Sequence, residues 1–162
     1  TDTASGKIFI KRPDRMRWEY QKPESQTIVT DGKQLWIYRP EDNQVMVGRA
    51  PAFFKGGKGA DFLADMQTIR EKFIILMDLK VAQNHHILKL LPKEKMIDID
   101  FINLWVTKKT FDVAHIITFN TYGDETRIQL SGFTFTERLD DALFIFKIPE
   151  GADVVQIDEA NF

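Results

Sequence analysis

Hydrophobic and polar residues alternate along the first fifty positions in short segments. In residues 15–20, Met16, Trp18 and Tyr20 fall on one face of a predicted strand, with two arginines and a glutamate between them. Asp31-Gly32 is a strong hairpin signal. The short connections between segments predict an antiparallel meander, because parallel neighbours need long crossovers. The strands predicted in this part are 6–11, 15–20, 26–30, 34–38 and 44–47.

The pattern changes once, between about residues 51 and 73. Residues 51–60 break the alternation, and from Asp61 to about Phe73 the apolar residues recur at helical spacing. This segment is predicted to be a helix. The alternation then returns, and the remaining predicted strands are 76–82, 84–91, 99–107, 111–120, 126–135 and 142–148.

Several predicted strands are apolar on both faces. In 34–38, Leu35 and Ile37 oppose Trp36 and Tyr38, so both faces must meet a helix, a second sheet or a ligand. In 126–135 the apolar residues change from even positions, Ile128 and Leu130, to odd positions, Phe133 and Phe135. This change predicts a bulge at Ser131-Gly132 that would help curl the sheet. The fold class is therefore mainly β (α+β). An ordinary core and a cavity for a long apolar ligand both remain open.

Composition excludes several classes of site. The 162 residues fit one domain and contain no cysteine, so a cysteine nucleophile and a thiolate metal site are excluded. The longest apolar run, residues 73–77, is too short to span a bilayer. The net charge of −2 does not suggest a nucleic-acid partner, although residues 1–60 carry eleven Lys and Arg against seven Asp and Glu.

The residues offer no catalytic or metal constellation. None of the three serines lies in a Gly-x-Ser-x-Gly elbow, and no cofactor motif is complete. His85 and His86 are neighbours on a predicted strand and point to opposite faces, so no metal site is predicted. The same alternation separates Trp18 and Tyr20 from the nearby arginines, which disfavours stacking on single-stranded nucleic acid.

Six sequence motifs are spread along most of the chain. They are Lys-Arg-Pro at 11–13, Arg-Trp-Glu-Tyr at 17–20, the run from Val29 to Pro40, Leu-Leu-Pro-Lys at 90–93, Leu-Trp-Val at 104–106 and the run from Phe144 to Val155. Their order and spacing resemble the LolA family of periplasmic outer-membrane lipoprotein carriers. The resemblance covers roughly residues 6–157.

This resemblance implies a fold and a function. The expected fold is an unclosed, strongly curled antiparallel β-barrel with a helical lid, in one carrier domain over 1–162. The expected function is to hold lipoprotein acyl chains in an apolar cavity in the periplasm, without an enzymatic step or a cofactor. Cargo would come from an inner-membrane ABC-type release complex and pass to an outer-membrane lipoprotein receptor, with only transient membrane contact.

The resemblance also suggests site residues. Arg12 matches the family arginine that hydrogen-bonds to the lid and holds the empty cavity closed, and Met16 and Trp18 match positions of the apolar lining. The alternation agrees for these two, which share a face. The expected cavity lining is Met16, Trp18, Tyr20 and Trp36, and the expected lid and gating residues are Arg12, Phe62, Leu63 and Met66.

One departure and three alternatives accompany the resemblance. Family members have an amphipathic helix and a strand before the segment matching residues 6–11, so the chain is expected to lack these and to self-associate or hold an amphiphile.

A LolB-like receptor would carry an apolar loop where residues 22–25 are short and polar. An RseB-like sensor would need a second domain. A lipid-modifying enzyme would need a nucleophile–base pair, and none is visible.

Overall fold

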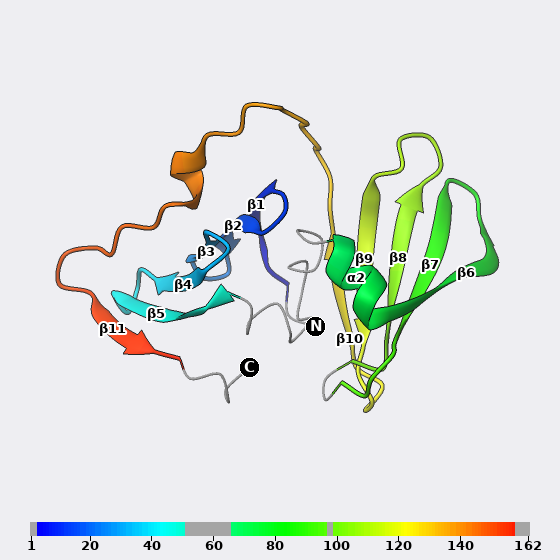
Figure 1. The fold of residues 1–162 in the computed structure, drawn as a ribbon, viewed down its shortest axis with the longest axis horizontal. Helices are drawn as coiled ribbons and strands as arrows, with labels where there is room; N and C mark the ends of the chain where they lie inside the picture. The colour runs from blue at the N-terminus through cyan, green and yellow to red at the C-terminus, as the bar shows by residue number, and fades with distance from the viewer. Residues whose placement is uncertain (1–2, 51–65, 97–98, 158–162) are drawn as a thin grey trace. The chain divides into compact units, whose positions relative to one another are not determined.

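Strands make up most of the described chain. The computed structural model describes residues 3–50, 66–96 and 99–157, and it contains two sheets that do not close into a barrel (Figure 1). The mainly β, unclosed architecture predicted from the sequence is confirmed. The chain divides into two compact units, one formed by residues 1–56 with 136–162 and the other by residues 57–135. Each unit is described by itself.

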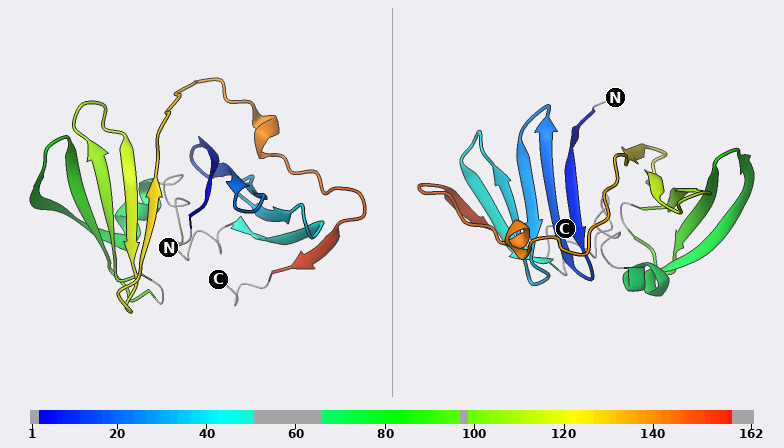
Figure 2. Two further views of the ribbon diagram at one scale, coloured as in Figure 1. Left: turned by 180° about the vertical axis from the view of Figure 1, so that it is seen from behind. Right: turned by 90° about the horizontal axis from the view of Figure 1, so that it is seen from above.

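The first unit is built on a six-stranded sheet in the order β1-β2-β3-β4-β5-β11. Its first five strands lie side by side in chain order as the predicted antiparallel meander (Figure 2). The Asp31 carboxylate accepts hydrogen bonds from the backbone N–H groups of Lys33 and Gln34, both at 2.8 Å, and Gly32 has φ +94°. The strands are β1 (Ser5–Lys11), β2 (Arg15–Lys22), β3 (Gln26–Thr30), β4 (Gln34–Arg39), β5 (Gln44–Arg49) and β11 (Asp153–Gln156).

Two features of the first unit differ from the sequence prediction. The sheet is not wholly antiparallel, because β11, which was not predicted, pairs in parallel with β5. The segment 142–148, predicted as a strand, instead begins with the 3₁₀ helix η2 (Asp141–Phe144) and makes no strand. Asp140 caps η2, since its carboxylate accepts a hydrogen bond from Ala142 N at 2.9 Å.

The strand register separates the side chains of this sheet into two faces. Residues directly opposite each other in paired strands share a face. One row therefore contains Ile8, Trp18, Ile28, Ile37 and Met46, and the next contains Ile10, Met16, Thr30 and Leu35. We call the surface formed by these two rows the apolar face.

The opposite face is covered by residues 139–146, which we call the strap. Phe144 is 1% exposed, and Phe146 lies against Trp36 and Tyr38, with ring centroids 6.2 and 5.8 Å apart. Arg17 donates a hydrogen bond to the carbonyl oxygen of Leu143 at 3.3 Å. The chain itself thus supplies an apolar cover for this face of the sheet.

The second unit is a five-stranded antiparallel meander in the order β10-β9-β8-β7-β6, with the helix α2 contacting β6. Leu90, Ile102 and Ile116 are completely buried on three adjacent strands. The elements are α2 (Met66–Lys72), β6 (Phe73–Ala82), β7 (His85–Pro92), β8 (Phe101–Thr107), β9 (Val113–Phe119) and β10 (Glu125–Gln129).

The second unit corrects several predicted boundaries. The helix predicted from Asp61 is described only from Met66, and Phe73, its predicted last apolar residue, is the first residue of β6. The strand predicted over 126–135 ends at Gln129, so the predicted bulge at Ser131-Gly132 lies beyond it. Gly132 has φ +66°, which suits a turn after the strand.

Candidate apolar binding face

The apolar face and its border on β2 bring together three of the predicted lining residues. Met16, Trp18 and Tyr20 alternate along β2, so all three point to the same side of the sheet. Met16 is completely buried, whereas Trp18 and Tyr20 are half-buried and stack on each other with ring centroids 5.0 Å apart. The two aromatic rings therefore pack against each other on the same side of the strand.

Neighbouring strands extend this surface on both sides of β2. The buried members of the cluster are Met16, Ile28, Leu35 and Ile37, and the partly buried side chains packed on them are Ile8, Ile10, Trp18, Tyr20, Met46 and Ile157. Thr30 is the one buried polar residue in the two rows, and its hydroxyl accepts a hydrogen bond from Gly32 N at 3.0 Å. None of the side chains in these rows is charged, so the face can bind a ligand only through apolar contact.

Trp36, the fourth predicted lining residue, lies on the other side of the sheet. It pairs with Val29 and Val47, one position out of phase with Ile28 and Ile37. Its ring stacks on Phe146 of the strap. The structure therefore separates Trp36 from the other three residues. Alternation within 34–38 puts Trp36 opposite Leu35 and Ile37, but both faces of that strand are apolar, and only the register shows which of them meets the face of Trp18.

The predicted gate cannot be assembled from the described residues. Arg12 lies in the turn between β1 and β2, and its side chain is exposed. Its guanidinium makes no hydrogen bond or ion pair with any residue in the described ranges. Phe62 and Leu63 lie outside those ranges, and Met66 is the first residue of α2. A gating role for these four residues stays a prediction.

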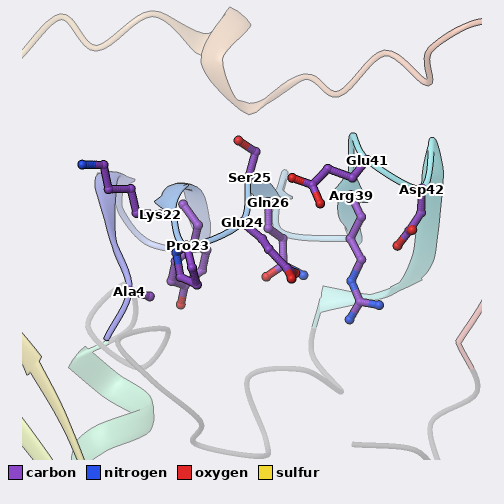
Figure 3. Close-up of a pocket in the computed structure, with 10 residues that line it drawn as sticks. Ala4, Lys22, Pro23, Glu24, Ser25, Gln26, Arg39, Glu41 and Asp42 are labelled. Carbon is purple, nitrogen blue, oxygen red and sulfur yellow. The ribbon is translucent and has the colours of Figure 1, made fainter. Parts of the chain in front are cut away.

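A polar pocket of about 390 Å³ lies at the end of the sheet, beside the β2–β3 and β4–β5 turns (Figure 3). Tyr20 belongs both to this pocket and to the apolar cluster, so the two surfaces adjoin. No pattern in the sequence pointed to this pocket. The lining residues are Ala4, Tyr20, Lys22, Pro23, Glu24, Ser25, Gln26, Arg39, Glu41 and Asp42.

One charged cluster anchors the strap to the face opposite the apolar one. The Asp141 carboxylate contacts Lys11 Nζ at 2.5 Å and Arg15 at 2.7 Å. The hydrogen bond from Lys11, together with the positive charges of Lys11 and Arg15, lowers the pKa of Asp141 below its usual value. Two of the basic residues in the first part of the chain are thus paired within this unit.

A second titratable cluster lies in the second unit. The rings of His85 on β7 and His115 on β9 are 6.1 Å apart, and each lies 5.7 Å from the ring of Trp105. Burial lowers the pKa of His115, and the nearby positive charges of His85 and Arg127 lower it further. His115 Nδ1 is buried without a hydrogen-bond partner in the described structure. This geometry favours the neutral imidazole.

Two other kinds of feature are absent from the part of the chain that the structure describes. There, no three His, Cys, Asp or Glu side chains are arranged to hold a metal ion. In the same ranges, no helix has the length and hydropathy required to cross a membrane.

Comparison with known sequences identifies a family. The model of the family described as "Outer membrane lipoprotein carrier protein LolA" matches residues 1–147. The chain is 33% identical to an outer-membrane lipoprotein carrier protein of Azotobacter vinelandii, over 94% of this chain and 72% of the relative. It is 34% identical to the protein of the same name in Chromobacterium violaceum, over 97% of this chain and 74% of the relative.

Comparison with solved structures supports the fold. The structure resembles the crystal structure of an uncharacterized conserved protein from Thermus thermophilus, with a TM-score of 0.60 and 14% sequence identity. The likeness covers 95% of this chain and 82% of the other.

Proposed function

The chain belongs to the LolA family of outer membrane lipoprotein carrier proteins, and from this we propose that it carries lipoproteins by holding their acyl chains against the apolar face. The proposed carrier makes and breaks no covalent bond. We place it in the periplasm, where it would receive cargo from an inner-membrane ABC-type release complex and deliver it to an outer-membrane receptor. Its own contact with either membrane would be transient.

The observation that carries this proposal is the uncharged, almost wholly apolar character of one face across five adjacent strands. An acyl chain has no hydrogen-bonding group, so a surface that binds it must lack unsatisfied polar atoms. In the two rows of the apolar face, the one polar side chain, Thr30, is satisfied within the protein. The half-buried Trp18 and Tyr20 rings offer a broad contact for a flexible chain.

The free energy of such binding must be limited for release to occur. Each methylene that leaves water contributes about 0.8 kcal/mol, so three acyl chains with roughly 40 methylenes would contribute about 30 kcal/mol if fully buried. Non-covalent affinities saturate near about −20 kcal/mol. We therefore propose partial burial of the chains, with the opening of a closed empty state subtracting from the gain.

We further propose that Arg12 stabilises that closed state together with a lid containing Phe62, Leu63 and Met66. Replacing Arg12 would then favour the open state and slow the release of cargo. Arg12→Leu should retain bound lipoprotein in the presence of an acceptor that empties the wild-type protein. Equal release by both proteins would refute this role for Arg12.

The carrier function is tested by native mass spectrometry after incubation with a triacylated lipopeptide. Trp18→Asp places a carboxylate on the apolar face and should abolish the 1:1 complex, because the charge would have to be buried against the acyl chains. Gln21→Asp is the matched control, since Gln21 is exposed on the same strand and does not belong to the apolar cluster. This variant should bind as the wild type does.

Folding of the variants is checked by circular dichroism before binding is measured. Trp18→Ala serves as a second variant should Trp18→Asp unfold, and it should weaken binding without adding a charge. If the wild type and both Trp18 variants bind the lipopeptide equally well, the binding site does not lie on this face. No binding by the wild type would refute the carrier proposal.

A further inference from the structure

A polar row borders the apolar face at the end of the sheet that carries the pocket. On each of three adjacent strands, a side chain able to hydrogen-bond lies two positions beyond an apolar residue of the face, so alternation puts it on the same side. These side chains are Tyr20 on β2, Gln26 on β3 and Arg39 on β4. In Figure 3, Gln26 and Arg39 extend to one side of the sheet end and Ser25 points to the other.

This row contains hydrogen-bond donors that the described structure does not use. The Arg39 guanidinium and the Gln26 amide make no hydrogen bond or ion pair with any residue in the described ranges. Both line the pocket of about 390 Å³, and Arg39 is exposed. Both side chains therefore line a pocket that adjoins the apolar surface, without a partner among the described residues.

We infer that Arg39 and Gln26 form a subsite for the carbonyl oxygens that join the acyl chains of the ligand to its polar head. This inference rests on the proposed carrier function and extends it to the ester and amide groups of the cargo. Two residues along a strand span about 7 Å, so a chain lying over the Trp18 row can end its apolar part at the Arg39 row. Ester and amide oxygens are acceptors that guanidinium and amide N–H groups satisfy.

The charges around the pocket select an uncharged head over a phosphate. Three carboxylates line it, from Glu24, Glu41 and Asp42, against the two cations Lys22 and Arg39. A phosphate would approach more negative than positive charges, whereas a carbonyl oxygen can accept a hydrogen bond without bringing a charge. The subsite therefore suits an acylated glyceryl-cysteine head better than an anionic phospholipid.

Matched ligands test this inference directly. One is a lipopeptide whose S-glyceryl cysteine carries two octanoyl esters, and the other is the same lipopeptide with two octyl ethers in place of the esters. Dissociation constants are measured for both by isothermal titration calorimetry. The wild type should prefer the diester about fivefold to tenfold, because the ether analogue lacks the carbonyl acceptors. In Arg39→Ala the two ligands should bind within about twofold of each other.

The control variant is Arg138→Ala, which removes another exposed arginine of the same unit. It should keep the wild-type preference for the diester. An unchanged preference in Arg39→Ala would overturn the subsite, as would tighter wild-type binding of dioctanoyl phosphatidylglycerol than of the diester. If neither lipopeptide binds the wild type, the carrier function itself fails, and that outcome is distinct from a lost preference between two bound ligands.

Discussion

Phe144 should contribute more to the stability of the first unit than any other described contact of the strap. Its side chain is 1% exposed, at the end of η2 within the strap. Truncating a buried phenylalanine to alanine removes its apolar contacts and leaves a cavity, which costs about 3–5 kcal/mol. The ion pairs that Asp141 makes at the other end of η2 are exposed, and exposed pairs contribute little. We therefore expect Phe144→Ala to lower the free energy of unfolding by about 3–4 kcal/mol.

The assay is urea unfolding followed by tryptophan fluorescence. Trp18 and Trp36 report on the first unit, and a Trp105→Phe background removes the signal of the second unit. A domain of this size is stable by about 4–12 kcal/mol, so the expected loss is a large fraction of the total. The urea concentration at the midpoint of unfolding should fall. The dependence of the unfolding free energy on urea concentration should stay the same, because the area exposed on unfolding hardly changes.

The neighbouring strap residue provides the control. Ile145 is 61% exposed, so Ile145→Ala should change the free energy of unfolding by no more than about 0.5 kcal/mol. A loss below about 1 kcal/mol for Phe144→Ala would refute the reasoning, because a phenylalanine side chain buried in the folded unit costs more than that to truncate. Equal losses in the two variants would show that the strap is held by its backbone rather than by Phe144.

Three further predictions concern charge and backbone geometry. The pKa of Asp141 is lowered in the folded state, so its stabilising contribution should be complete above its unfolded pKa and lost as the pH falls through its folded pKa. In a carboxyl NMR titration, Lys11→Met should move the folded pKa of Asp141 back towards its usual value. The pKa of His115 is lowered in the folded state, so below about pH 6.5 the unfolded state binds a proton that the folded state binds less readily. The free energy of unfolding measured in urea should therefore be lower at pH 5 than at pH 8, and His115→Leu should reduce this difference. Gly32→Ala should destabilise the protein by about 1–3 kcal/mol in the same assay, since φ is +94° and the new Cβ would overlap the Asp14 carboxylate; a neutral result would contradict this geometry.

Local sequence signals predicted the first five strands and their order. The alternation in 15–20, the Asp31-Gly32 turn and the short connections leave few topologies open, and the pairing of β1 to β5 confirms the meander. These signals depend on residues near each other in the chain. The turn chemistry fixes which strands are neighbours, and the period of two fixes which side chains share a face.

The errors occur where the outcome depends on distant residues. β11 pairs with β5, more than a hundred positions away, and its four residues carry no turn signal that points to that partner. Residues 142–148 alternate like a strand, yet Phe144 and Phe146 are apolar because they cover a sheet, not because they belong to one. Sequence alternation alone does not distinguish these two reasons for an apolar position.

The two tryptophans of the first unit show why only one face is a candidate site. Trp18 and Trp36 lie on opposite sides of the same sheet, and each is half-buried. Trp36 stacks on Phe146, which the chain supplies from the strap, so the apolar surface on that side is already matched. Trp18 stacks on Tyr20, a neighbour on its own strand, and this contact widens the apolar face instead of covering it. A sheet that is apolar on both sides needs two covers, and the strap provides one of them. The face that includes Trp18 is therefore the one on which an acyl chain can add contacts without displacing the strap.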